Sequence, residues 1–218
     1  MPGRFVTFEG GEGVGKSTQI RRLAERLADI GEDVVLTREP GGSPRAERLR
    51  ETLLSGAVKR FGTFAETVLI ASARADHVDR VIRPAIRRGA FVLCDRFIDS
   101  TRAYQGVLGG LDEKAIKAME RVATAGAWPD LTIVLDAPVD RSLERVRRRA
   151  RGAAADRFEA EDDSFHVKLR AAFIAAARAE PERCVLIDGE GPEAVVAARI
   201  WDIVSQRLAL PGGRSAAQ

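Results

Sequence analysis

The octapeptide GGEGVGKS at residues 10–17 matches the pattern G-x-x-x-x-G-K-[ST] and is the strongest constraint on the fold of this chain. It follows an apolar run, RFVTFE at residues 4–9, and precedes an amphipathic stretch at residues 16–30. A strand, a glycine loop and a helix in this order form a phosphate site, because the loop amides and the helix N-terminus point towards the anion. The motif therefore predicts an α/β sheet that binds a nucleoside triphosphate at its edge.

The residue types of this loop suit that chemistry, with one exception. The glycines let backbone N–H groups face the phosphates, Lys16 can reach phosphate oxygens, and Ser17 is the expected Mg²⁺ ligand. The carboxylate of Glu12 is unexpected, since phosphates repel it. The predicted ATP-binding residues are Gly10, Gly11, Glu12, Gly13, Val14, Gly15, Lys16, Ser17 and Thr18.

Short apolar runs alternate with longer amphipathic stretches, which is typical of a parallel sheet covered by helices. The predicted fold class is α/β, a three-layer P-loop NTPase fold with a five-stranded parallel sheet flanked by helices. We expect strands at residues 4–9, 33–37, 91–95, 131–136 and 184–188. We expect helices at about residues 16–30, 44–54, 64–88, 112–125, 139–149, 163–179 and 192–208.

Composition limits the classes of protein that remain. The 218 residues, 45% of them hydrophobic, suit one domain over residues 1–210 with a disordered tail at 211–218. The 35 basic residues barely outnumber the 32 acidic ones, too even a balance for a general nucleic-acid surface. No apolar run approaches the roughly 20 residues that span a bilayer. Cys94 and Cys184 lie in apolar runs typical of buried, reduced thiols, so we expect a cytoplasmic protein. From the charge balance and the lengths of the apolar runs, we expect neither a stable nucleic-acid partner nor a membrane.

Charged residues follow two of the predicted strands. Arg38 comes directly after the second strand, Asp95 ends the third, and Arg96 follows it. The carboxyl ends of parallel strands converge on the ligand crevice. An arginine fork matches a phosphate monoester, and a carboxylate can orient Mg²⁺ through water. Any one of these residues alone would suggest a surface ion pair, but together they indicate a second, anion-accepting site.

Four segments carry a resemblance to a known family: FEGGEGVGKST at 8–18, TREPGG at 37–42, DRFIDSTRAYQG at 95–106 and WPDLTIVLDAP at 128–138. In this order and spacing they resemble bacterial thymidylate kinases, which transfer the γ-phosphate of ATP to dTMP. The resemblance implies a P-loop fold of the nucleoside monophosphate kinase type. The resemblance spans residues 5 to about 188. The phosphate loop is shared by a large superfamily, whereas the second and third segments together are specific to this family.

The resemblance implies roles for individual side chains. It implies that the Glu12 carboxylate reaches the acceptor sugar near its 3′-hydroxyl; read from the residues alone, a solvated side chain outside the loop is the alternative. It implies that Arg38 and Arg96 grip the acceptor phosphate and that Asp95 belongs to the magnesium and catalytic region. Arg74 resembles the arginine that bonds the carbonyl edge of thymine.

The remaining acceptor positions also come from the resemblance. Tyr104 would line the pocket and crowd a ribose 2′-hydroxyl; without the family it could be a half-buried core ring. Ile70 stands where family members usually carry a Phe that stacks on thymine, so a stacking contribution on the order of 1 kcal/mol is lost. The full set of predicted dTMP-binding residues is Glu12, Arg38, Ile70, Arg74, Arg96, Ser100, Tyr104 and Gln105.

The run RVRRRARG at residues 145–152 has five arginines within seven residues. Such runs are usually solvated helix ends. In the family, however, a lid closes over ATP here, and members without an arginine in the phosphate loop supply one from the lid. Gly13 places this chain among them, so we expect a lid insertion at about 147–159. The predicted catalytic residues are Lys16, Arg38, Asp95, Arg149, Arg151 and Arg157.

The predicted reaction is phosphorylation of dTMP to dTDP for dTTP supply, with ATP as donor and Mg²⁺ held by Ser17 and Asp95. Another nucleoside or nucleoside-monophosphate kinase on the same fold, and an ATP-driven protein-binding switch, remain alternatives. The apolar helix at 64–82 indicates a homodimer, as in the family. His77 and His166 are expected at the surface or in packing, because neither has a second ligand at metal spacing.

Overall fold

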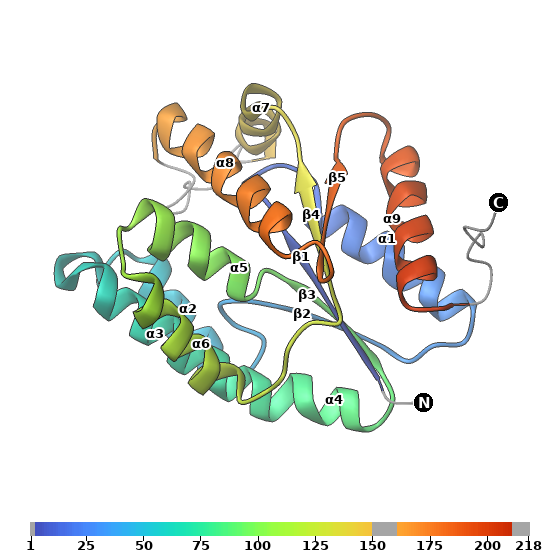
Figure 1. The fold of residues 1–218 in the computed structure, drawn as a ribbon, viewed down its shortest axis with the longest axis horizontal. Coiled ribbons are helices and arrows are strands. Elements are labelled where there is room, and N and C mark those ends of the chain that lie inside the picture. The colour runs from blue at the N-terminus through green and yellow to red at the C-terminus, as the bar shows by residue number, and fades with distance from the viewer. Residues whose placement is uncertain (1–2, 150–160, 211–218) are drawn as a thin grey trace.

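The computed structural model describes residues 3–149 and 161–210, and of Arg149 only the backbone. Its centre is a parallel sheet of five strands in the order β2-β3-β1-β4-β5, with helices on both faces (Figure 1). The predicted three-layer P-loop fold is confirmed. The strands are β1 (Arg4–Glu9), β2 (Val34–Arg38), β3 (Phe91–Asp95), β4 (Leu131–Asp136) and β5 (Cys184–Asp188).

The helices form the two outer layers (Figure 1). One face of the sheet carries α1 (Lys16–Asp29) and α9 (Glu193–Arg207). The opposite face carries α4 (Arg83–Arg87), α5 (Ile98–Thr101) and α8 (Asp163–Ala179). Beyond these lie α2 (Pro44–Leu54), α3 (Gly62–His77) and α6 (Glu113–Thr124), and α7 (Val139–Arg149) packs against α8.

Burial explains why the central strands form continuous apolar runs. β1, β3 and β4 are buried along almost their whole length, since helices cover both of their faces. The two edge strands, β2 and β5, instead mix buried or half-buried residues with exposed ones. The largest core cluster lies between the sheet and helices α1 and α9, around Phe8, Leu27 and Trp201. Cys94 and Cys184 are buried free thiols, as expected.

Two predicted element boundaries are wrong. β2 ends at Arg38 rather than at residue 37, because Arg38 still pairs in register with Asp95 of β3. The single helix expected at 64–88 is divided into α3, a π-helical turn (Val78–Ile82) and α4. Pro84 stands in the first turn of α4, where its missing N–H and fixed φ disturb the helix least.

The helical segment after β3 was not predicted. α5 continues into a π-helical segment (Arg102–Leu108). Its buried side includes polar residues such as Asp99, Thr101 and Gln105, each less than 5% exposed. Residues 98–108 therefore lack the apolar period of 3.6 residues by which a helix is recognised, so the sequence pattern did not predict this helical segment.

Both histidines are buried, which confirms a packing role rather than a surface position. His77 is 0% exposed; its Nε2 lies 2.6 Å from Thr37 Oγ1 and its Nδ1 lies 3.0 Å from Glu39 Oε1. His166 is 5% exposed. Across residues 3–149 and 161–210, no helix has the length and apolar character needed to cross a bilayer.

Candidate active site

Among the cavities at the carboxyl ends of the strands, two adjoin the phosphate loop and Asp95 and have the residues of a donor and an acceptor site; parallel α/β sheets bind their ligands at this edge. The donor cavity, about 470 Å³, surrounds residues 13–19 and the loop after β5. The acceptor cavity, about 140 Å³, lies between the phosphate loop, the end of β2, helix α3 and the segment after β3. Asp95, the last residue of β3, lines both cavities. Two ligands bound there would therefore meet at this carboxylate.

The phosphate loop has a backbone that needs glycine. Gly10, Gly13 and Gly15 all have positive φ, at 129°, 71° and 104°. At Gly13 space is limiting as well, because a Cβ would lie 2.1 Å from the backbone oxygen of Ser142 on α7. Helix α7 is therefore packed directly onto the loop.

The N-terminus of α1 faces the donor cavity without a side-chain cap. Helices α2, α6 and α8 are capped by Ser43, Asp112 and Asp162, whose side chains accept backbone N–H bonds. α1 follows Gly15 and, like α3, α5 and α9, has no side-chain cap, but its first turn at residues 16–19 lines the donor cavity. The first-turn amides of α1 are thus left for an anion, as expected of a phosphate site.

Lys16 is held inside the loop that it serves. Its side chain is 7% exposed, and Nζ donates to Gly10 O at 3.0 Å and Gly11 O at 2.7 Å. Burial, together with the nearby Arg96 charge, lowers the pKa of Lys16 from 10.5 to about 8. Phosphate oxygens would restore a counter-charge next to this ammonium group, so the loop favours a bound anion.

The two predicted metal residues lie together. Ser17 Oγ donates to Asp95 Oδ2 at 2.8 Å, from the first turn of α1 to the end of β3. A hydroxyl and a carboxylate beside a phosphate site match the donors that Mg²⁺ uses with substrate phosphates and water. No group of three or more His, Cys, Asp or Glu side chains that could hold a metal occurs in the described parts of the chain.

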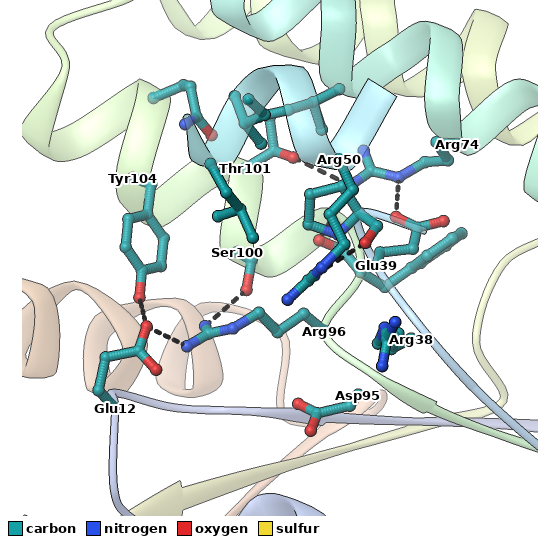
Figure 2. A pocket seen from close by; sticks show the side chains of 16 residues that line it. Glu12, Arg38, Glu39, Arg50, Arg74, Asp95, Arg96, Ser100, Thr101 and Tyr104 are labelled. Atoms are coloured by element: carbon teal, nitrogen blue, oxygen red, sulfur yellow. Dashed lines mark hydrogen bonds and ion pairs between the residues drawn. The ribbon is translucent and has the colours of Figure 1, made fainter. Parts of the chain in front are cut away.

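Glu12 points away from the donor cavity and lines the acceptor cavity (Figure 2). Its Oε1 accepts a bond from Arg96 Nη2 at 2.6 Å and one from the Tyr104 hydroxyl at 2.8 Å. Of the predicted ATP-binding residues, 13–18 line the donor cavity, whereas Gly10, Gly11 and Glu12 do not. The acid of the phosphate loop therefore belongs geometrically to the second ligand.

The protonation of Glu12 follows from these contacts. Burial alone would raise the pKa of Glu12, but the charges of Arg96 and Lys16 and the bonds from Tyr104 and Arg96 outweigh it. The pKa falls from 4.5 to about 2. Glu12 is therefore a carboxylate at neutral pH, and it holds Arg96 and Tyr104 at one point of the cavity wall.

Arg74 is fixed at the other end of the cavity (Figure 2). It is 3% exposed; its Nε donates to Glu39 Oε2 at 2.6 Å, and its Nη2 donates to Phe97 O and Thr101 Oγ1. The guanidinium carbon lies 5.0 Å from the centre of the Phe97 ring, within cation–π range. Its orientation is thus set before any ligand binds.

All eight residues predicted for the acceptor side line this cavity. Some are engaged with protein groups: Gln105 donates to Glu66 at 2.7 Å, and Arg38 Nη2 donates to Glu47 at 3.0 Å. Ile70, 7% exposed, lies in the wall one helical turn before Arg74. An aliphatic side chain thus takes the position at which the resemblance implies an aromatic ring.

Sequence reasoning missed several lining residues. Helix α2 contributes Arg50, Leu53 and Leu54 to the acceptor cavity, and Arg50 Nη1 donates to Pro40 O at 2.9 Å. The sequence signal was the amphipathic stretch that follows TREPGG, which was predicted only as a helix at 44–54. In the donor cavity the missed residues include Arg145 of α7 and residues 191–193 after β5.

Part of the predicted lid cannot be placed. Arg151 and Arg157 lie outside the described residues, as does the side chain of Arg149 and most of the expected insertion at 147–159. The tail at 211–218 is outside them as well. Among the arginines of the run whose side chains the structure describes, Arg145 lines the donor cavity.

A triphosphate loop next to a second cavity rich in arginine defines a P-loop phosphotransferase with a small anionic acceptor. The family model described as thymidylate kinase matches residues 8–200. The chain belongs to the thymidylate kinase family.

Individual relatives agree with this assignment. The chain is 55% identical over 206 residues to a thymidylate kinase of Bradyrhizobium sp. (strain ORS 278), covering 94% of this chain and 91% of the relative. It is 53% identical over 208 residues to the thymidylate kinase of Caulobacter vibrioides, covering 95% and 99%. A crystal structure of thymidylate kinase from Ehrlichia chaffeensis has a TM-score of 0.76 at 29% identity and covers 94% of this chain and all of that one.

Proposed function

We propose that this chain transfers the γ-phosphate of ATP to dTMP, giving dTDP and ADP, with Mg²⁺ as cofactor. Family membership supports the reaction. The observation that carries it in this molecule is that Asp95 lines both cavities, so a donor and an acceptor phosphate can approach each other there. In the reaction an oxygen of the dTMP phosphate bonds to the γ-phosphorus, and the bond from that phosphorus to the β–γ bridging oxygen breaks. No covalent enzyme intermediate is needed.

On the donor side the protein supplies positive charge and backbone N–H groups. Lys16 and the first-turn amides of α1 bind the triphosphate oxygens. Ser17 and Asp95 would hold Mg²⁺, which would supply positive charge next to the phosphates. Asp95 helps to orient Mg²⁺ and the phosphates, and it is not phosphorylated during the transfer.

On the acceptor side, Arg96 has donors to spare. A guanidinium carries five N–H groups. Nη1 donates to Gly10 O and Ser100 Oγ, and Nη2 donates once, to Glu12. Within the described parts of the chain, Nε–H and a second Nη2–H are left, and two donors on one guanidinium suit two oxygens of a phosphate. We assign Arg96, with Arg38, to the dTMP phosphate.

Arg74 is suited to the base. Its Nε and Nη2 are used by Glu39, Phe97 and Thr101, which leaves the Nη1 amino group for a ligand among the described contacts. Thymine carbonyls accept such bonds. Leu53, Leu54 and Ile70 give this end of the cavity an apolar wall that suits the base.

Arginines of the run at 145–152 would complete the site as the lid closes. Phosphoryl transfer spreads negative charge over the equatorial oxygens, and an arginine delivered there is worth about 10³–10⁵ in rate in related systems. Arg145 lies in the donor cavity already. Arg149, Arg151 and Arg157 remain proposals for the same role, and closure would exclude water as a competing acceptor.

Assembly and location are part of the proposal. Phe61, Phe64 and Val68 are 63%, 58% and 42% exposed along and just before α3, an apolar surface that supports a homodimer through this helix. We place the protein in the cytoplasm, without a nucleic-acid partner, and treat residues 1–210 as one kinase domain with its lid.

The test is ADP release with ATP and Mg²⁺ against dTMP, dUMP, the ribose form of TMP, dCMP, dGMP and AMP. Rapid turnover with dTMP and weak turnover with the ribose form would support the assignment of Glu12, Arg74 and Tyr104. Preference for another monophosphate would move the chain to a different acceptor. If no monophosphate increased ADP release, the assignment of the acceptor site would be wrong, and an ATP-driven switch would be the remaining function.

A further inference from the structure

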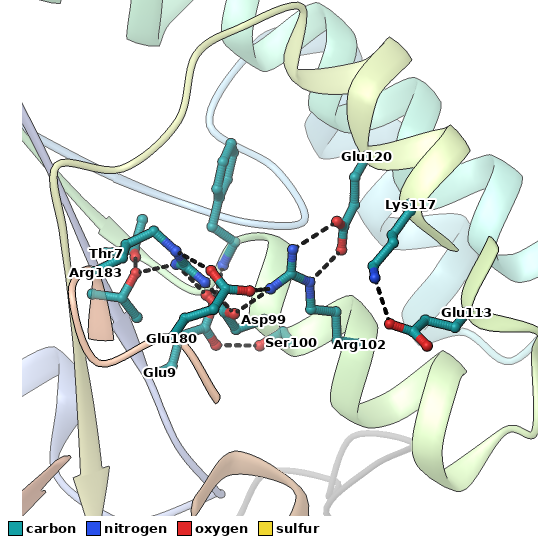
Figure 3. A network of polar contacts seen from close by, with 12 residues as sticks. Thr7, Glu9, Asp99, Ser100, Arg102, Glu113, Lys117, Glu120, Glu180 and Arg183 are labelled. Carbon is teal, nitrogen blue, oxygen red and sulfur yellow. Dashed lines mark hydrogen bonds and ion pairs between the residues drawn. The ribbon is translucent and has the colours of Figure 1, made fainter. Parts of the chain in front are cut away.

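Glu9, the last residue of β1, is a buried carboxylate to which the site described above gives no role. Its side chain is 0% exposed. Oε1 accepts the backbone N–H of Phe97 at 2.7 Å, and Oε2 accepts the Ser100 hydroxyl at 2.6 Å (Figure 3). Both donors belong to the segment that follows β3. Glu9 therefore joins the strand before the phosphate loop to the segment that carries the acceptor arginine.

Ser100 connects Glu9 to Arg96 through hydrogen bonds. The Ser100 Oγ that donates to Glu9 also accepts from Arg96 Nη1 at 3.1 Å. Because its proton is directed at Glu9, the lone pairs of this hydroxyl are turned to the guanidinium. The order of donors is thus Arg96 to Ser100 to Glu9, with the carboxylate as the final acceptor.

The backbone around Arg96 also depends on Glu9. Arg96 has φ of 71°, a left-handed conformation that non-glycine residues rarely adopt. Its own N–H is held by Phe8 O at 2.9 Å, and the next N–H, that of Phe97, is held by Glu9. Strained backbone of this kind persists only where neighbouring bonds hold it, and it gathers at functional sites.

A neighbouring carboxylate shows what a purely structural acid looks like here (Figure 3). Asp99 is 1% exposed and is neutralised by Arg183, whose Nη1 and Nη2 both donate at 2.8 Å, with Arg102 near by. Glu9 forms no ion pair with any described residue. Burial, and then the Asp99 charge, raise the pKa of Glu9 from 4.5 to about 7. A carboxylate kept under such conditions destabilises the fold, so packing alone does not account for it.

We propose that Glu9 is a positioning residue for the acceptor phosphate: through Ser100 and the Phe97 amide it holds the Arg96 guanidinium in the orientation that grips dTMP. This inference rests on the proposed binding of dTMP, and it adds a residue of the sheet to the acceptor site. Glu9 touches neither ligand nor reacting atoms.

Titration calorimetry with dTMP and with thymidine, at about pH 8 so that Glu9 is ionised, tests the proposal. Glu9→Gln keeps the volume and leaves an oxygen for the Phe97 N–H, but its amide donates to Ser100 and reverses the relay. We expect dTMP affinity to fall about tenfold, a typical effect for a hydrogen bond to a charged group, with thymidine affinity unchanged. A merely structural role would weaken both ligands equally.

Glu120→Gln is the matched control. Glu120 is a 2% exposed carboxylate of α6 that accepts two bonds from Arg102, in the same region but with no bond to Ser100 or Arg96. This variant should lose stability and keep the wild-type ratio of dTMP to thymidine affinity. If it changed that ratio as Glu9→Gln does, the effect would not be specific to Glu9.

A double-mutant cycle tests the route through Ser100. Ser100→Ala should reproduce the dTMP-selective loss, Ser100→Thr should restore it by keeping the hydroxyl, and combining Glu9→Gln with Ser100→Ala should add little. Additive losses would show that the two residues act separately and would overturn the relay.

The two proposals fail in different ways. If wild-type protein binds dTMP no more tightly than thymidine, the assignment of the acceptor phosphate site is wrong. If wild-type protein discriminates the two ligands and Glu9→Gln discriminates them equally well, the role of Glu9 alone is refuted.

Discussion

Arg96 Nη2 lies 2.6 Å from Glu12 Oε1, so an acid of the phosphate loop is paired with an arginine of the neighbouring cavity. The exposed fractions of the two side chains are only 14% and 17%. The loop that binds one substrate therefore shapes the site for the other.

Glu12→Gln should weaken the acceptor and not the donor. Removing the charge leaves the partly buried Arg96 without its counter-ion, so we expect kcat/KM for dTMP to fall at least about tenfold while KM for ATP stays within about twofold. Steady-state kinetics with each substrate varied in turn measures this. Glu113→Gln, an exposed acid on α6, is the control. A rise in KM for ATP alone would contradict our placement of Glu12.

The pH dependence of stability should report the same pair. The folded-state pKa of Glu12, about 2, lies below the ordinary 4.5, so the unfolded chain binds the proton more readily. The charge of Glu12 therefore stabilises the fold above pH 4.5, and this contribution is lost as pH falls towards 2; the full interval corresponds to about 3 kcal/mol. In urea unfolding from pH 7 to 3, the stability difference between wild type and Glu12→Gln should shrink as pH falls. A pH-independent difference would refute the lowered pKa.

Gly13→Ala should destabilise the protein by about 3 kcal/mol and reduce ATP affinity. The new Cβ would overlap Ser142 O, and φ at 71° is strained for alanine. Gly126→Ala is the matched control, since φ there is 87° but nothing lies within 4 Å of the Cβ. Urea unfolding of both variants separates the clash from the strain. If both variants lost the same free energy of unfolding, α7 would be able to move away from the new Cβ at little cost.

Arg145→Met should lower kcat at least about tenfold with little change in KM for dTMP, because a cation in the donor cavity stabilises the charge of the transferring phosphoryl group. Arg147→Met is the control: Arg147 is 74% exposed and forms a long ion pair with Asp163, at 3.9 Å. Single-turnover rates at saturating substrates give the comparison. Equal effects of the two substitutions would assign the loss to the charge of the run as a whole.

Ile70→Phe should tighten dTMP binding about fivefold, through a stacking gain on the order of 1 kcal/mol. Ile70→Leu keeps the volume without a ring and should leave the affinity near that of wild type. Calorimetry with dTMP distinguishes them. Weaker binding by Ile70→Phe would show that the ring overfills a cavity of about 140 Å³.

Prediction from sequence succeeded where one physical signal dominated. Buried parallel strands require continuous apolar runs, and the loop at 10–17 requires glycine at positions of positive φ, so both could be recognised. The acceptor residues were reached through the resemblance. Their convergence on one cavity is a three-dimensional fact that only the structure supplies.

Prediction failed where burial is polar. The segment 98–108 packs Asp99, Thr101 and Gln105 inwards, and Glu9 ends a strand that otherwise reads as apolar. A buried polar residue can be explained once its partners are known. Glu9 accepts bonds from Phe97 and Ser100, and Asp99 accepts bonds from Arg183; in each case the partner is about 80 residues or more away in sequence. Arg145 was passed over because one-dimensional charge counting cannot tell which arginine of a run faces a cavity.

The approach of α7 to Gly13 also bears on how such enzymes can diverge. An arginine in place of Gly13 would drive its side chain into the backbone of α7, the helix whose Arg145 lines the donor cavity. An arginine side chain at position 13 and the present position of α7 are therefore mutually exclusive. An enzyme built like this one could acquire an arginine at position 13 only together with a shift of α7.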